Sequence, residues 1–353
     1  MPQRVSIIGL GLIGGSIGLG LRRWSSTSPG AKGSSGGLEI VGFDADLEQQ
    51  RYAKKIGAVD RTEWDLQSAI RDADIVVLAT PVGAMRTVFE DISSRLKAGS
   101  VVTDTGSTKV QVLDWAKELL PTTVSFVGGH PMAGKAQSIE AAEADLFKGA
   151  TWCVAPSINA SDDAVRNVLG LIAALEAEAY FIDPHEHDAY VAGVSHLPFV
   201  LSAALVRTVA TDPSWRDMKS LTAGGFRDMS RLAAGSPAMH RDILRTNRDA
   251  ILRWIDQFQS NLQDMRTAIA SEGDATTPEL EGFLIDARDA RADWSTQTRR
   301  EGELLQSTAA ELAPDSIGDQ MGRMLLGGLG RRRGKLNERL AAAEKGRDQR
   351  DRR

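Results

Sequence analysis

The start of this chain combines a short β-branched run with a glycine pattern that constrains the fold more than any other feature. Val5 to Ile8 reads as a strand, and Gly9, Gly11 and Gly14 follow it with the spacing Gly-x-Gly-x-x-Gly before a helical stretch. In such a unit the first glycine allows a tight turn, the second lets a pyrophosphate approach the backbone, and the third permits close packing of the helix on the strand. The pattern therefore predicts dinucleotide binding at the N-terminus of this helix. A glycine-rich turn without a ligand is the alternative.

The alternation of strands and helices continues through roughly the first 157 residues. The further apolar runs Leu38 to Phe43, Asp74 to Thr80, Ser100 to Thr103 and Val124 to Val127 are separated by helical stretches. Strands in this order favour a parallel sheet with helices on both faces. Later apolar residues recur at helical spacing, and strand-like runs are few. We therefore expect an α/β fold, in which an N-terminal, Rossmann-type doubly wound parallel sheet (residues 1–157) is followed by an all-α domain (residues 158–305).

Residues 306–353 form a third expected part, an extension that ends in a basic tail. From Arg331 onward the sequence holds ten Lys and Arg against four Asp and Glu, a net charge of +6 in a chain whose total is −5. A basic tail can contact nucleic acid, but a solvated, partly disordered extension is the simpler interpretation. The acidic total gives no reason to expect nucleic acid or an anionic membrane as the main partner. A Ser-, Gly- and Pro-rich surface insertion is expected over Trp24 to Gly37.

The composition narrows the class of protein further. Cys153 is the sole cysteine, so no intrachain disulfide or cysteine zinc site is expected, which fits a reducing cytoplasm. We find neither a secretory signal nor a run of about 18 apolar residues, and so expect a cytoplasmic protein without a membrane span. His185, His187 and His196 lack the spacing and the carboxylates of a metal site, so no metal is expected.

Residues at the ends of successive strands define the expected cofactor site. Asp44 ends the second strand, where an acidic side chain can bind the two ribose hydroxyls of a dinucleotide. Its alternative role is a helix cap. A carboxylate there repels a 2′-phosphate, and no arginine follows immediately, so NAD is expected rather than NADP. The expected cofactor-binding residues are Gly9, Gly11, Leu12, Ile13, Gly14, Asp44, Thr80 and Pro81.

Candidate catalytic groups follow the next two strands. His130 comes after the run Val124 to Val127, and its imidazole could take a proton from an alcohol whose carbon gives up a hydride. A structural histidine is the alternative. Ser107, on a Gly-preceded turn, is suited to orienting a neighbouring imidazole, although a lone serine could instead cap a helix. Arg227 and Arg231 suggest a carboxylate clamp, with an interhelical salt-bridge cluster as the alternative.

Together these residues resemble the prephenate/arogenate dehydrogenase family of tyrosine biosynthesis. The resemblance covers about residues 4–300 and rests on motifs in the same order, at residues 9–16, 104–109, 129–134, 195–198, 225–231, 236–237 and 242–243. It implies NAD-dependent oxidative decarboxylation of prephenate to 4-hydroxyphenylpyruvate. A dehydrogenase for arogenate, or for both cyclohexadienyl substrates, is the alternative.

The resemblance also implies roles for individual residues. His130 would hold the ring hydroxyl as the catalytic residue, Ser107 would hydrogen-bond in the same site, and Arg231 would bind a substrate carboxylate. His196, within Ser195-His196-Leu197-Pro198, is expected to contact the substrate. Lys135 would suit the extra carboxylate and keto group of prephenate better than the ammonium of arogenate. The family's helical domain forms a homodimer, so a homodimer is implied here.

The chain departs from the family pattern at three places and leaves two rival functions open. Lys135 and Ala136 stand where some members have two polar or acidic residues. Phe199 stands where many members have a second histidine, and His240 where some have tryptophan. No ACT-type or chorismate mutase domain is visible, so tyrosine feedback through such a domain is not expected. A β-hydroxyacid dehydrogenase would rely on a lysine in the helical domain and leave the Gly-His-Pro motif unexplained. An NAD-binding redox-sensing module would leave Arg231 without a substrate.

Overall fold

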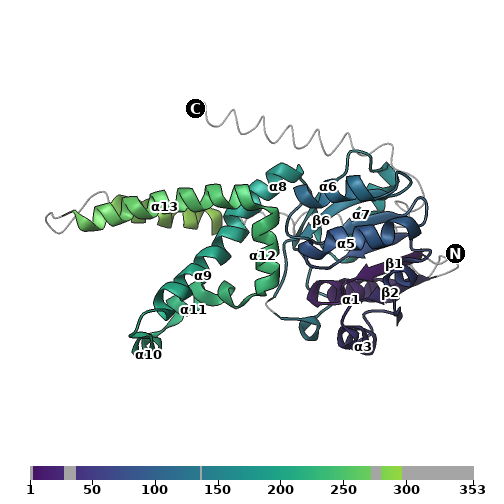
Figure 1. Cartoon of the computed structure of the whole chain (residues 1–353), viewed down its shortest axis with the longest axis horizontal. Coiled ribbons are helices and arrows are strands. Elements are labelled where there is room, and N and C mark those ends of the chain that lie inside the picture. Colours follow the sequence, from purple (N-terminus) through teal and green to yellow (C-terminus); the bar gives the residue numbers. More distant parts are fainter. Residues whose placement is uncertain (1–2, 28–36, 136, 272–279, 296–353) are drawn as a thin grey trace, which may run out of the picture.

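The computed structural model describes residues 3–27, 37–135, 137–271 and 280–295 and shows an α/β domain followed by a helical one (Figure 1). The expected extension over residues 306–353, with its basic tail, lies outside the described residues, as does most of the expected insertion. The described start of that insertion, up to Thr27, instead continues the first helix.

An eight-stranded sheet forms the centre of the first domain, in the order β3-β2-β1-β4-β5-β6-β7-β8. All neighbouring strands are parallel except β6 and β7. The strand order reverses between β1 and β4, and at such a point ligands bind beyond the carboxyl ends of the strands. The predicted doubly wound sheet is confirmed. Its strands are β1 (Gln3–Ile8), β2 (Leu38–Phe43), β3 (Arg61–Thr62), β4 (Ile75–Leu78), β5 (Val101–Asp104), β6 (Ser125–Pro131), β7 (Thr151–Pro156) and β8 (Glu178–Phe181).

Helices cover both faces of this sheet and bury its apolar strands. One buried cluster contains Ile7, Ile17 and Trp152, and a second contains Ile8 and Phe89. Neighbouring residues of β1 thus supply opposite faces, as the alternation of side chains along a strand requires. The helices of this domain are α1 (Leu12–Thr27), α3 (Leu47–Lys55), α4 (Leu66–Ile70), α5 (Val82–Ile92), α6 (Val110–Leu119) and α7 (Asp162–Ala174), with the short η1 (Ser93–Arg95) and η2 (Ile139–Ala141).

The domain boundary predicted after residue 157 comes too early. Val168 and Ile172 of α7 belong to the same buried cluster as Ile7, and β8 pairs in parallel with β7 at the edge of the sheet. The α/β domain therefore extends to Phe181. The sequence could not reveal this, because the apolar spacing of α7 is the same whether a sheet or another helix covers it.

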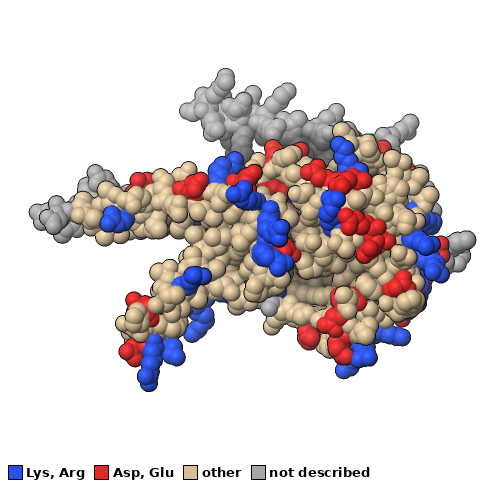
Figure 2. Space-filling model, in the orientation of Figure 1, with Lys and Arg blue, Asp and Glu red and all other residues tan. Residues whose placement is uncertain are grey.

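The second domain is helical, as predicted, and two arms diverge from its base beside the sheet (Figure 1). One arm contains α13, and the other contains α9, α10 and α11. Large apolar side chains such as Leu252, Phe258 and Leu262 of α13 remain exposed, and uncharged residues predominate over both arms (Figure 2). The elements are α8 (Pro184–Val191), η3 (Ala192–His196), α9 (Leu197–Ala210), α10 (Trp215–Met218), η4 (Lys219–Leu221), α11 (Gly224–Ser230), η5 (Arg231–Ala234), α12 (Pro237–Thr246) and α13 (Arg248–Ala270).

The elements α8, η3 and α9 form one continuous helix, Pro184–Ala210, whose most apolar 18-residue window has a mean hydropathy of 1.7. By length and composition alone it could cross a membrane, and within the described ranges it is the only helix that could. The sequence-based expectation considered uninterrupted apolar runs, and His187, Asp188 and His196 interrupt this one. All three side chains are buried and hydrogen-bonded within the protein, which fits a helix packed against protein. A cytoplasmic location stays a prediction.

Candidate active site

The glycine loop between β1 and α1 has the geometry that its spacing predicts. Gly9 adopts a φ of +95°, and a Cβ at this position would lie 2.5 Å from the carbonyl oxygen of Ala79. A Cβ at Gly14 would lie 1.9 Å from the carbonyl oxygen of Gly9, so both positions require glycine. A Cβ at Gly11 would meet no atom within 4 Å. This open space adjoins the first turn of α1, whose unpaired N–H groups attract anions. The turn also contains the predicted cofactor residues Leu12 and Ile13.

Asp44 fixes the conformation of the loop beside it. Its carboxylate accepts hydrogen bonds from the N–H groups of Leu10 at 2.7 Å and Asp46 at 2.8 Å, and the residue is half-buried. Asp46, not Asp44, caps α3 by accepting the N–H of Glu48, so the helix-cap alternative for Asp44 is wrong. A carboxylate has about four lone-pair sites, which leaves capacity for hydroxyl donors at the end of β2.

Thr80 and Pro81 lie at the end of β4, next to Gly9. The Oγ1 atom of Thr80 is buried and has no hydrogen-bond partner among the residues that the structure describes. Helix α5 begins after Pro81 without a side-chain cap. Buried polar atoms and the first N–H groups of a helix normally find partners, so both features suit a polar ligand in the crevice.

His130 is buried at the same edge of the sheet. Strand β6 runs further than the sequence indicated, so His130 lies within it and pairs with Cys153 of β7. The residue is 8% exposed, and its Nδ1 lies 2.9 Å from the Nε2 of His187. Burial lowers the pKa of His130 well below its usual value, and electrostatic interactions with His187, Lys109 and His196 lower it further. His130 is therefore neutral at neutral pH and able to accept a proton.

Two residues of α8, His187 and Asp188, form a hydrogen-bonded chain with His130. The Nδ1 of His187 lies 2.7 Å from the Oδ1 of Asp188, and His187 is completely buried. The carboxylate of Asp188 also accepts the N–H groups of Lys109 at 2.7 Å and Val110 at 3.0 Å. These amides begin α6, and the N-terminal end of a helix favours negative charge. The sequence had raised His187 only as a metal ligand, and no local pattern in α8 indicates its contact with β6.

A buried ion pair joins the ends of β5 and β6 beneath the site. Asp104 and Lys109 have no exposed side-chain surface, and Lys109 Nζ donates to the Asp104 carboxylate and, at 2.7 Å, to the carbonyl of Gly129. Asp104 also accepts the N–H groups of Gly106 at 2.8 Å and Gly129 at 3.0 Å. These bonds offset the cost of burying two charges. They also fix the backbone immediately before His130.

Ser107 lies half-buried in the loop after β5. Within the described residues no hydrogen bond joins its hydroxyl to another group, so its contact in the reaction stays a prediction. Helix α6 has Lys109 at its N-cap position and no side-chain cap, so Ser107 does not act as the cap that was its alternative role.

His196 is buried in the π-helical turn η3, at the base of the helical domain. Its Nδ1 lies 3.2 Å from the Nδ2 of Asn247, while its Nε2 has no hydrogen-bond partner in the described part of the chain. Burial lowers the pKa of His196 to about 4, although Asp188 and the backbone of Ser107 act in the opposite direction. The free Nε2 could serve a substrate, as predicted, but this role is untested.

The two predicted substrate-binding cations lie at the surface. Lys135 pairs with Glu143 at 2.6 Å, and both side chains are well exposed. Arg231, at the start of η5, is exposed and forms no ion pair with a described residue, so the salt-bridge cluster proposed as its alternative is not found there. The structure brings neither cation into contact with His130. Their roles toward substrate stay predictions.

Two of the positions at which the chain departs from the family pattern, Phe199 and His240, contact each other. The rings of Phe199 and His240 stack with centroids 4.1 Å apart and planes at 1°. Phe199 also packs against His196, with ring centroids 6.1 Å apart. Phe199 and His240 therefore contact each other next to His196, a candidate substrate-binding residue.

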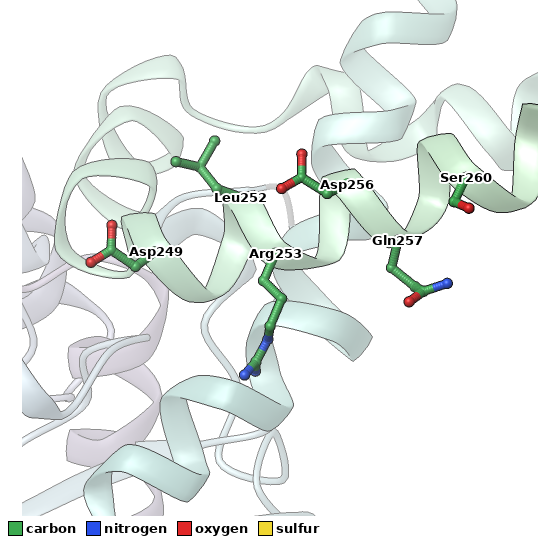
Figure 3. A pocket seen from close by; sticks show the side chains of 6 residues that line it. All are labelled: Asp249, Leu252, Arg253, Asp256, Gln257 and Ser260. Atoms are coloured by element: carbon green, nitrogen blue, oxygen red, sulfur yellow. The ribbon is translucent and has the colours of Figure 1, made fainter.

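A separate hollow of about 520 Å³ lies along α13 (Figure 3). All of its lining residues belong to that one helix, so it is a feature of the helical arm and not of the sheet edge that carries His130. The lining residues are Asp249, Leu252, Arg253, Asp256, Gln257 and Ser260.

Comparison with known proteins gives two family models that match the chain one after the other. The nucleotide-binding domain of prephenate dehydrogenase matches residues 32–181, and its dimerization domain matches residues 183–282. A prephenate dehydrogenase of Bacillus subtilis (strain 168) is 36% identical over 275 residues, which are 77% of this chain and 71% of that protein. The chain belongs to the prephenate dehydrogenase family. The junction of the two models coincides with the end of β8, which supports the corrected boundary.

Two further members of the prephenate dehydrogenase family show its range. A cyclohexadienyl dehydrogenase of Zymomonas mobilis subsp. mobilis is 30% identical over 76% of this chain and 89% of that protein. The crystal structure of prephenate dehydrogenase from A. aeolicus in complex with hydroxyphenyl propionate and NAD+ is 28% identical, with a TM-score of 0.73. That match covers 83% of this chain and 98% of the A. aeolicus chain. The family resemblance predicted from the motifs is thus confirmed.

Proposed function

We propose that this protein is an NAD-dependent dehydrogenase that converts prephenate to 4-hydroxyphenylpyruvate by oxidative decarboxylation, a step of tyrosine biosynthesis. One observation carries the proposal. A buried, neutral imidazole, that of His130, lies at the carboxyl edge of the same sheet whose β1 leads into the glycine loop. Beside a nicotinamide, such a group is suited to receive the proton of a substrate alcohol.

The crevice residues suit NAD. The open space at Gly11 would hold the pyrophosphate, Asp44 the ribose hydroxyls, and Thr80 offers a buried hydroxyl that still needs a partner. The carboxylate of Asp44 would repel the 2′-phosphate of NADP. When bound, NAD accepts the hydride from the ring carbon that carries the substrate hydroxyl. The A. aeolicus relative was solved with NAD+.

His130 handles the proton of the reaction. Its neutral imidazole accepts the substrate hydroxyl proton as that carbon loses its hydride, so the C–O bond becomes a carbonyl. The ring carboxylate then leaves as CO2, and the electron pair of the broken C–C bond completes the aromatic ring. The phenolate oxygen takes its proton back from His130, so no net proton is released. We assign Ser107 and His196 to the positioning of the ring and Arg231 to a substrate carboxylate.

The choice between prephenate and arogenate depends on the side chain of the substrate. Lys135 would attract the extra carboxylate of prephenate, but its partner Glu143 also places an anion there that could attract the ammonium of arogenate. One relative is named a cyclohexadienyl dehydrogenase. We therefore propose prephenate as the substrate, with arogenate, alone or in addition, as the second candidate.

A direct assay tests the function. Purified protein is mixed with NAD and either prephenate or arogenate, side by side, and the absorbance of the reduced cofactor is followed, with NADP in parallel. We expect reduction with prephenate and NAD. If neither substrate reduces NAD, the dehydrogenase proposal fails and an NAD-binding sensor becomes the better explanation.

We also propose that the protein is a homodimer formed through its helical domain. The helix Pro184–Ala210 is only 28% buried over its most apolar window, and Leu252, Phe258 and Leu262 of α13 are exposed. Exposed apolar surface of this extent is typical of a subunit interface. The matching family model is described as a dimerization domain. Light scattering after gel filtration should give twice the chain mass of 38.0 kDa, and a monomer would contradict the proposal.

A further inference from the structure

His130, His187 and Asp188 form a chain of side-chain hydrogen bonds whose last member fixes the position of every proton. An ionised carboxylate can only accept hydrogen bonds. Asp188 lies at the start of α6, where the N–H groups of Lys109 and Val110 both donate to it. Since this environment stabilises the anion, the 2.7 Å contact between Asp188 Oδ1 and His187 Nδ1 requires a proton on that nitrogen.

The same reasoning extends one residue further. A neutral imidazole with its proton on Nδ1 has a bare Nε2, which can only accept. The 2.9 Å contact between His187 Nε2 and His130 Nδ1 therefore requires His130 to donate from Nδ1. His130 is then left with an unprotonated Nε2. That nitrogen makes no hydrogen bond to any described residue.

We propose that His187 and Asp188 are positioning residues that hold His130 in the tautomer whose Nε2 accepts the proton of the substrate hydroxyl. The identity of that hydroxyl rests on the proposed function, but the tautomer is a property of the free protein. The arrangement has the logic of a catalytic triad in which an acidic residue orients the base. Here the carboxylate of Asp188 orients the base, His130, through the intervening imidazole of His187.

The chain also stabilises the charge that His130 acquires. When Nε2 takes a proton, the imidazolium still donates through Nδ1 to His187, and the anion of Asp188 lies behind it. His187, Lys109 and His196 all disfavour a positive charge on His130. Cys153, which pairs with His130 across the sheet, has a thiol whose pKa is raised by burial. In the proposed arrangement, the carboxylate of Asp188 offsets these effects through its hydrogen bond to His187.

The test combines a direct observation of the tautomer with turnover. Protein labelled with 15N at histidine is examined by NMR without substrate, as wild type, His187→Leu, His187→Gln and Asp188→Asn. Gln keeps an oxygen acceptor near the position of the His187 Nε2, whereas Leu keeps only bulk. The control is His185→Leu, an exposed residue two positions earlier on the same helix.

We expect a neutral, Nδ1-protonated His130 in the wild type and in His185→Leu. His187→Leu should lose this preference and reduce kcat by about 10²-fold or more, since altering the orienting member of a triad can cost about 10⁴-fold. The affinity for NAD should stay unchanged, and His187→Gln should recover part of the loss. A purely structural role for His187 would not produce recovery through an acceptor together with a change of tautomer.

Two results would overturn the proposal. One is a wild-type His130 protonated on Nε2, which would mean that His187 is cationic or donates in the opposite direction. The other is His187→Leu with unchanged kcat. If the leucine variant does not fold, the proposal is decided by the tautomer of His130 in the wild-type spectrum and by the tautomer and kcat of Asp188→Asn. If wild-type protein reduces no NAD with either substrate, the proposed function fails, but the tautomer result stands by itself.

Discussion

The ammonium of Lys109 and the carboxylate of Asp104 form an ion pair without any exposed side-chain surface, between the end of β5 and the start of α6. Replacing Lys109 by Met keeps the length of the side chain but leaves Asp104 buried without its counterion. We expect the free energy of unfolding to fall by about 3–5 kcal/mol. Urea denaturation measures this change.

The double variant Lys109→Met/Asp104→Asn serves as the control for this pair. Because it removes both charges, it should be more stable than the single Lys109→Met variant. A single variant with the stability of the wild type would show that the pair does not hold the strand ends together.

A side chain introduced at Gly11 and one introduced at Gly14 should have different effects, the first on NAD affinity and the second on thermal stability. Gly11→Val points into open space, so we expect an unchanged melting temperature and an NAD affinity lower by about tenfold or more, equal to about 1.4 kcal/mol. Gly14→Ala would place its Cβ 1.9 Å from the Gly9 carbonyl oxygen, so we expect a loss of thermal stability. Thermal melts and NAD titrations measure both. If Gly11→Val binds NAD with wild-type affinity, the proposal that NAD binds at this loop is contradicted.

The preference for NAD over NADP should depend on the charge of Asp44. Asp44→Asn keeps an acceptor for the N–H of Leu10 but removes the negative charge. A hydrogen bond to a charged group contributes about 1.5–3 kcal/mol, so kcat/KM for NAD should fall by about 10- to 100-fold. The value for NADP should fall less or rise. Equal losses with both cofactors would contradict a contact between Asp44 and the ribose.

The lowered pKa of His196 predicts how stability changes with pH. Its pKa is about 4 in the folded protein and 6.5 in the unfolded chain, so in this window only the unfolded chain binds the proton. The contribution of His196 to the free energy of unfolding is therefore fully present above pH 6.5 and declines as the pH falls toward 4. A shift of this size corresponds to about 3 kcal/mol. The difference in unfolding free energy between wild type and His196→Gln, measured across this range, isolates the effect, and a pH-independent difference would contradict it.

The sequence predicted the parts of the site that depend on local geometry. The glycine loop, the sheet and the position of His130 near the carboxyl end of a strand all follow from spacing within a few residues. The contact of His130 with His187 did not, because the two residues are 57 positions apart and meet only when α8 packs against the sheet. The domain boundary was wrong for a related reason, since a helical repeat does not show which element will cover it. The orphaned hydroxyl of Thr80 is likewise visible only once its neighbours are in place.

The account depends above all on His130 as the group that accepts the substrate proton. The most direct measurement is the turnover of His130→Asn with prephenate and NAD, together with its affinity for NAD, beside the exposed control His185→Asn. We expect the His130 variant to lose about 10²- to 10⁴-fold in kcat, while NAD binding and the control remain at wild-type values. Unchanged turnover in His130→Asn would contradict the account.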